Sequence, residues 1–115
     1  MLYFASLSHS PDKCPGVAVD IRDRVLTMAS TMTEVLQTHG CTFQGGWVSK
    51  SAHLTFLVIE GPNSHAVDDA LVDLGLAVWN TATIYPVITL DEEQRINFYS
   101  NLPGVAERQV PVGAP

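Results

Sequence analysis

Two stretches of the chain have the apolar periodicity of an α-helix, and each lies between stretches that resemble β-strands. The first runs from Asp20 to Gly40 and the second from Asn63 to Gly75. Apolar side chains recur in both at intervals of three and four residues. Asp20 and either Asn63 or Ser64 are residue types that cap helix N-termini, and each glycine stands where a left-handed cap would end a helix. We therefore predict two amphipathic helices that bury one face each.

Four stretches have the composition of β-strands. Residues 1–8 are apolar on both alternating faces, which is typical of a central strand that is covered on each side. Residues 41–48 alternate and contain a glycine pair that indicates a bulge. Residues 53–59 are rich in β-branched and aromatic side chains and follow a short turn, so these two strands should form a hairpin. Residues 82–90 would form the fourth strand, and Pro86 places it at a sheet edge or at a bulge.

The resulting order of elements, strand, helix, strand, strand, helix, strand, predicts an α+β, ferredoxin-like fold. This βαββαβ arrangement has a four-stranded antiparallel sheet with two helices on one face. We expect residues 1–99 to form this single domain, ending in a short amphipathic turn or helix from Asp91 that packs Ile96 and Phe98 inward. Residues 100–115, with recurring proline and glycine, would form an extended C-terminal tail that is disordered or embraces a neighbouring subunit.

The composition indicates self-association. Hydrophobic residues make up 46% of the chain and charged residues only 16%, which is apolar for a small soluble monomer. Two helices on one face would leave the other face of the sheet bare, although the strands are apolar on both faces. We therefore predict a homodimer, or a higher assembly, in which two sheets pack face to face as in a dimeric α+β barrel.

Charge and cysteine content limit the other partners. The formal net charge is −6 with only 6 Lys+Arg, so no basic surface is available for phosphates, and neither nucleic acid nor an anionic membrane is expected as a partner. No apolar run approaches the roughly 20 residues of a membrane-spanning helix, and no basic leader precedes a long apolar stretch. We expect a cytoplasmic protein in which Cys14 and Cys41 remain thiols.

Chemistry-bearing side chains should gather at one end of the predicted sheet. In this topology the end of the first strand, the turn of the hairpin and the start of the fourth strand share one edge. That edge would carry His9, Cys14, Trp47, His53 and Trp79. The opposite edge would carry His39, Cys41, Glu60 and His65. A disulfide between the two cysteines would have to span the sheet, which is longer than a disulfide permits.

His9, His53 and Cys14 are the candidate catalytic residues. Imidazole and thiolate are also ligands for zinc, copper or nickel, and a histidine can hold a neighbouring cysteine as a thiolate nucleophile. The alternative to catalysis and metal binding is a structural role. His9 would then end the strand, Cys14 would fill a gap under the loop and His53 would lie half exposed in the hairpin. A His-x4-Cys spacing is not a zinc motif by itself, so the metal ligands, and any cofactor, remain unassigned.

Four aromatic residues are candidates for binding a ligand: Tyr3, Trp47, Trp79 and Tyr85. They could line a cavity between the sheet and the helices, or one inside the barrel of a dimer. An apolar pocket with a few polar groups is the usual binding site of a small molecule. Core packing is the alternative role for the same side chains.

Three spans resemble small bacterial ferredoxin-like proteins, one group of which is described as nickel-binding. They are Phe-Gln-Gly-Gly-Trp at 43–47, Glu-Gly-Pro-Asn-Ser-His-Ala-Val at 60–67 and Ile-Tyr-Pro-Val at 84–87. In those proteins a strand ends in an acidic-Gly-Pro-Ser-like turn before the second helix. The resemblance implies the ferredoxin-like fold. It transfers no nickel ligands, because this chain lacks the histidine-rich N-terminal region expected of the nickel binders.

Three hypotheses for function follow. The first is a small dimeric protein that binds a small apolar molecule, or a metal ion, in a pocket at the rim of the sheet. The second is a cofactor-free enzyme of the α+β barrel type, an isomerase, cyclase or oxygenase, with His9 or His53 as acid/base. The third is an accessory subunit whose apolar surface and tail serve only contacts. The residues alone leave the choice among them, and the identity of the ligand, open.

Overall fold

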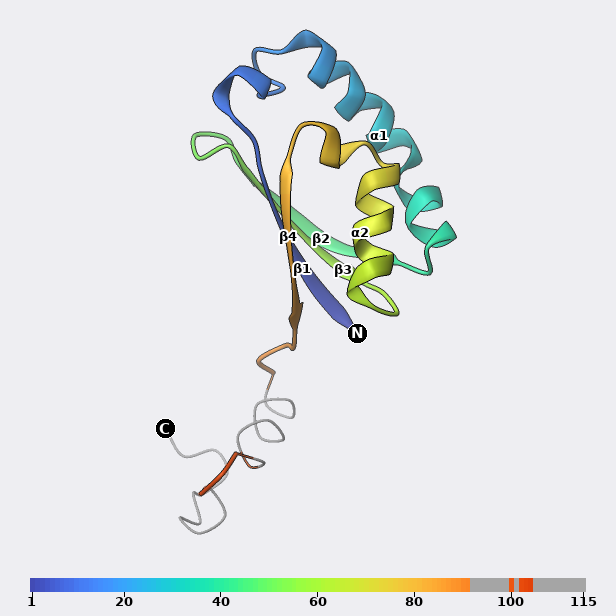
Figure 1. Ribbon diagram of the computed structural model, residues 1–115, viewed down its shortest axis with the longest axis vertical. Coiled ribbons are helices and arrows are strands. Elements are labelled where there is room, and N and C mark those ends of the chain that lie inside the picture. Colours follow the sequence, from blue (N-terminus) through green and yellow to red (C-terminus); the bar gives the residue numbers. More distant parts are fainter. Residues whose placement is uncertain (92–99, 101, 105–115) are drawn as a thin grey trace.

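The computed structural model describes residues 1–91, 100 and 102–104 of the chain and shows the predicted ferredoxin-like fold. Both α-helices lie on the same side of a four-stranded sheet (Figure 1). The elements in chain order are β1 (Leu2–Ser8), the 3-10 turn η1 (Pro11–Lys13), α1 (Val19–Thr38), β2 (Thr42–Ser49), β3 (Leu54–Glu60), α2 (Ser64–Asp73), the 3-10 turn η2 (Leu76–Val78) and β4 (Thr81–Val87).

The strands are ordered β2-β3-β1-β4, and every neighbouring pair is antiparallel. β1 is therefore a central strand, as its two apolar faces predict. β4 is an edge strand, where Pro86 lies opposite Tyr3 and its missing N–H is tolerated. The predicted bulge in β2 is also present, because the register with β3 shifts between Phe43 and Gly45.

The core lies between the sheet and the helices. From β1 it takes Tyr3, Ala5 and Leu7, whose side chains alternate with residues facing the other side of the sheet. α2 packs closely on this layer through Val67, Ala70 and Leu71. α1 contributes fully buried side chains only near its two ends, Ile21 and Leu36. The middle of α1 is consequently less tightly packed than α2.

The structure confirms the predicted N-cap of α2 and the predicted glycine at the C-terminal end of each helix. The Asn63 side-chain oxygen accepts a hydrogen bond of 2.8 Å from the Ala66 amide. Gly40 follows α1 with φ +69° and Gly75 follows α2 with φ +77°, both in the left-handed region that a side chain disfavours. These two glycines set the directions in which the chain leaves the helices.

The predicted capping role of Asp20 is wrong. α1 begins one residue earlier, at Val19, and its N-cap is Ala18, which makes no side-chain hydrogen bond. A side chain of the first turn instead bonds to the preceding loop. The Arg22 side chain donates to the carbonyl oxygens of Pro15 and Gly16, at 2.9 and 3.0 Å, and so ties the first turn of the helix to that loop.

The face of the sheet away from the helices carries exposed aromatic side chains. Trp47 and Tyr85 are 62% and 50% exposed. Between them, the rings of Phe4 and Phe56 stack with centroids 5.6 Å apart. An aromatic surface of this kind on a sheet is typical of an interface. We refer to Phe4, Trp47, Phe56 and Tyr85 as the aromatic face.

One predicted strand is shorter in the structure, and other predicted elements lie outside the described residues. β4 ends at Val87, three residues before the predicted end of the strand. The predicted turn or helix containing Ile96 and Phe98, and most of the predicted tail, lie outside the described residues. Among the described helices, none combines the length and hydropathy needed to cross a membrane.

Replacing Asn63 by alanine should destabilise the fold through one lost cap. The Ala66 amide would lose its side-chain acceptor, and we expect the free energy of unfolding to fall by about 1 kcal/mol. Urea denaturation measures this change. Ser64→Ala, one residue further on, is the control and should change stability by less than about 0.5 kcal/mol. Equal stability of Asn63→Ala and Ser64→Ala would contradict the capping role.

Candidate functional site

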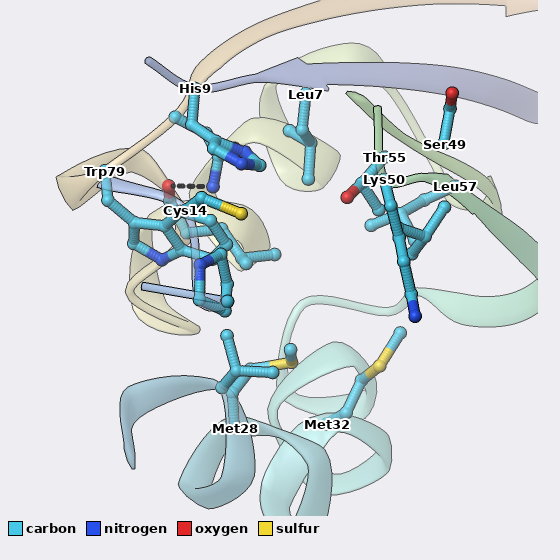
Figure 2. Close-up of a pocket in the computed structure, with 16 residues that line it drawn as sticks. Leu7, His9, Cys14, Met28, Met32, Ser49, Lys50, Thr55, Leu57 and Trp79 are labelled. Atoms are coloured by element: carbon cyan, nitrogen blue, oxygen red, sulfur yellow. Dashed lines mark hydrogen bonds between the residues drawn. The ribbon is translucent and has the colours of Figure 1, made fainter. Parts of the chain in front are cut away.

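A cavity of about 520 Å³ lies between α1 and the sheet. Its walls are mostly apolar, with His9 and Cys14 on one side and Ser49, Lys50 and Thr55 on the other (Figure 2). The described residues that line it are Leu7, His9, Cys14, Pro15, Gly16, Val25, Met28, Met32, Val48, Ser49, Lys50, Thr55, Leu57, Leu76, Trp79 and Asn80. A cavity of this size and composition is in the range of small-molecule binding sites.

The cavity lies beside the middle of α1, which packs against the core but is less deeply buried than the ends of the helix. Its central apolar residues Val25, Met28 and Met32 face the cavity and are only partly buried. On the sheet side, Leu57 lines the cavity and packs closely over Gly46, where a Cβ would come within 3.0 Å of a Leu57 methyl carbon. Methionine side chains are flexible, so this wall can adjust to the shape of a ligand.

His9, Cys14 and His53 lie close together, as the topology predicts, and two of them, His9 and Cys14, line one end of the cavity. One ring nitrogen of each histidine and the Cys14 Sγ all lie within 4.8 Å of one another. The two imidazole rings are 5.2 Å apart at an angle of 75°. The His9 amide also donates a hydrogen bond of 3.3 Å to the His53 carbonyl, which ties the end of β1 to the hairpin. We refer to these three residues as the rim cluster.

The imidazole nitrogens of the rim cluster are buried without hydrogen-bond partners. Within the described part of the chain, neither ring nitrogen of His9 nor Nδ1 of His53 has one. Buried polar atoms nearly always have a partner, because leaving one unpaired costs about 1–3 kcal/mol. A group from outside the protein, such as water, an ion or a ligand, would satisfy these atoms.

The backbone holds His53 in an unusual conformation. Its φ of +55° is the only positive φ of a non-glycine residue among those described. The His53 amide donates to the Lys50 carbonyl at 3.2 Å, and the His53 carbonyl accepts from His9, so both sides of the residue are fixed. Residues held in this region without glycine are enriched at functional sites.

Cys14 is held by the loop between β1 and α1. Its amide donates to the Pro11 carbonyl at 3.3 Å, and its carbonyl accepts from Val17 and Ala18 at 2.9 and 2.8 Å. Nearby, a hydrogen bond from Ser10 lowers the pKa of the exposed Asp12 carboxyl. The half-buried thiol therefore sits at a fixed position in a loop that carries an ionised carboxylate.

Of the four predicted ligand-binding aromatics, Trp79 lines the cavity. It is nearly buried at the end of η2, and its ring lies 5.2 Å from that of His9 at an angle of 51°. Tyr3 is buried in the core instead. Trp47 and Tyr85 belong to the aromatic face, on the other side of the sheet, so Trp47 does not join the rim cluster as the topology alone predicts. A site inside a dimer barrel, the second predicted location, would include both.

Several lining residues have no signal in the sequence. Met28 and Met32 fit the helical periodicity of α1 as core residues, and only the separation of α1 from the sheet makes them a cavity wall. Lys50 and Asn80 stand in turns, where polar residues are ordinary. The Asn80 carboxamide donates to the Leu76 carbonyl at 3.1 Å, while its own buried oxygen has no partner among the described residues.

The opposite end of the sheet carries a different set of groups. Cys41 is buried there, and burial raises the pKa of its thiol. His39 bonds to the Asp73 carboxylate across 2.5 Å and so joins the ends of the two helices. Both cysteines are free thiols, and only Cys14 belongs to the rim cluster.

Comparison with known proteins identifies the fold and no closer relationship. No protein-family model matches the sequence, and no curated protein matches it. The crystal structure of SCO4226 from Streptomyces coelicolor A3(2) is similar, with a TM-score of 0.55 and 17% identity over 77% of this chain and 99% of that one. An antibiotic biosynthesis monooxygenase gives a TM-score of 0.44 and 14% identity over 77% and 100% of the two chains. The first likeness shows a shared fold.

The two thiols should react at very different rates in the folded protein. Cys14 is half-buried in a loop, whereas Cys41 is buried with a raised pKa, and thiolate is the reactive form. Limited iodoacetamide treatment at neutral pH, followed by peptide mass spectrometry, should modify Cys14 at least about tenfold faster. In urea the two rates should become similar. Equal rates in the folded protein would show that the core around Cys41 is open.

Proposed function

We propose that this protein binds a small apolar molecule in the cavity between α1 and the sheet. The observation that carries the proposal is the cavity itself, about 520 Å³, with apolar walls and a few polar groups at its rim. Burial of apolar ligand surface would supply most of the affinity, at about 25 cal/mol per Å². The polar groups would set the orientation of the ligand.

The lining residues favour an apolar acid. Lys50 is the one described lining residue with a permanent charge, and it lies across the cavity from His9 and Cys14 (Figure 2). A carboxylate near this ammonium group would gain a charge-assisted hydrogen bond, while the hydrocarbon part would contact Met28, Met32 and Leu57. A neutral analogue of the same length would keep only the apolar contacts.

Calorimetric titration with decanoic acid and with decanol tests this function. We expect the acid to bind more tightly, and Lys50→Met to remove the difference because it removes the ammonium group. Met28→Trp should fill the cavity and weaken binding of both by at least about tenfold. Leu26→Trp is the matched control, since Leu26 is exposed on the same helix and does not line the cavity. No binding to the wild-type protein, or equal effects of the two tryptophan variants, would contradict the proposal.

The rim cluster supports a second candidate, a cofactor-free enzyme of the α+β barrel type that acts on the bound molecule. His9 lines the end of the cavity and His53 lies beside it, and either imidazole would serve as the acid/base. Mass spectrometry of the ligand recovered from the complex separates the candidates. A binding protein returns the ligand unchanged, whereas an enzyme returns a product and loses this conversion in His9→Gln or His53→Gln.

We also propose that a second copy of the chain covers the aromatic face. The exposed Trp47 and Tyr85 and the stacked Phe4 and Phe56 would pack against their counterparts in a homodimer. Two sheets that pack in this way would enclose both aromatic faces between them. The cavity would remain accessible, because it lies on the helix side of each sheet.

Trp47→Glu should convert this dimer to a monomer. A carboxylate in the middle of an apolar interface costs more than the contacts it replaces. Light scattering during size-exclusion chromatography measures the mass, and Val72→Glu, an exposed position on α2, is the control that should remain dimeric. The interface is wrong if the wild-type protein is a monomer at tens of micromolar or if Trp47→Glu remains a dimer.

A further inference from the structure

We propose that His9, Cys14 and His53 form a binding site for one zinc ion, with a fourth coordination position left for a ligand from outside the protein. The site stands on the geometry of the rim cluster and does not depend on the proposed binding of an apolar acid. The two proposals share only His9 and Cys14, which also line the end of the cavity.

The first argument is the distance between the ligand atoms. Zinc bonds of about 2.0–2.1 Å to nitrogen and 2.3 Å to sulfur place tetrahedral ligand atoms about 3.4–3.6 Å apart. In this structure the three atoms lie within 4.8 Å of one another. Each pair would therefore have to close by at most about 1.2–1.4 Å to complete the set, a movement within the reach of side-chain rotation.

The second argument is that the histidine nitrogens have no other partner. Both ring nitrogens of His9 and Nδ1 of His53 are buried without a hydrogen bond among the described residues. A metal ion would satisfy one nitrogen of each ring and remove most of this cost. The histidines of the opposite end differ, because His39 is already paired with Asp73 and His65 is exposed.

The third argument is that the backbone around the ligands is fixed before any ion arrives. His9 and His53 are joined by a main-chain hydrogen bond, Cys14 is held by three others, and Trp79 packs against the His9 ring. The backbone of His53 is held at a left-handed φ of +55° by hydrogen bonds on both of its sides. Preorganised ligands lose little entropy when they bind, which favours affinity.

The chemistry of the ligand set selects the class of ion. Two imidazoles and one thiolate, with no carboxylate, suit zinc and other borderline or soft ions and are poor ligands for magnesium or calcium. On binding, the S–H bond of Cys14 breaks, its proton leaves to solvent, and the sulfur forms a bond to the ion. A divalent ion and one thiolate leave a charge of +1 at the end of the cavity. Water or the carboxylate of a ligand would complete the coordination.

Metal titration of the purified full chain tests the site without any organic ligand. After chelator treatment and dialysis against zinc sulfate, we expect about one zinc per chain by elemental analysis. Cobalt in place of zinc should give the absorption of a thiolate-cobalt bond. Cys14→Ser should abolish this band and weaken zinc binding at least about tenfold, and His53→Gln should weaken zinc binding to a similar extent. His65→Gln, an exposed histidine outside the cluster, should bind as the wild type does.

Less than about a tenth of a zinc per chain in the wild-type protein, or unchanged binding by Cys14→Ser, would overturn the proposal. If a variant fails to fold, alkylation of Cys14 in the folded wild-type protein replaces it. The alkylated thiol cannot bind cobalt, so the absorption band should be absent. Bound zinc should in turn protect Cys14 from iodoacetamide. Decanoic acid is absent from these measurements, so their failure is distinct from failure of the binding function.

Discussion

Antiparallel pairing of β1 with a strand on each side determines where the functional groups of this protein lie. Leu7 of β1 is opposite Thr55 of β3 and Ala82 of β4, so the end of β1, the start of β3 and the start of β4 fall on one edge of the sheet. His9, His53 and Trp79 flank these positions in the chain. The hydrogen bond between the His9 amide and the His53 carbonyl then joins two turns that are far apart in sequence.

The fold and the rim cluster could be predicted because both follow from periodicity and topology. Two helical stretches and four strands admit few arrangements, and in the ferredoxin-like one His9, Cys14 and His53 must share an edge. Trp47 shows the limit of this reasoning. The register shift between Phe43 and Gly45 changes the alternation of β2, so Phe43 pairs with Ile59 of the helix side, whereas Trp47 pairs with Phe56 of the aromatic face. A glycine pair indicates that a bulge is present. The pairing of β2 with β3 determines which residues on each side of the bulge face the helices.

The cavity could not be predicted for a different reason. Val25, Met28 and Met32 have the spacing of ordinary core residues, and the sequence contains nothing that says they are only partly buried while Ile21 and Leu36 are buried. Their partial burial depends on the position of α1 relative to the sheet, and this position is a property of the whole fold. His9 and Cys14 of the rim cluster line the end of the same cavity.

An anomalous difference map from a crystal grown with zinc tests this account most directly, because it locates the ion and the three side chains together. The account predicts one peak at bonding distance from an imidazole nitrogen of His9, an imidazole nitrogen of His53 and the Cys14 sulfur, at the end of the cavity under α1. A peak elsewhere, or histidine rings that turn away from one another to bond with protein groups, would contradict it.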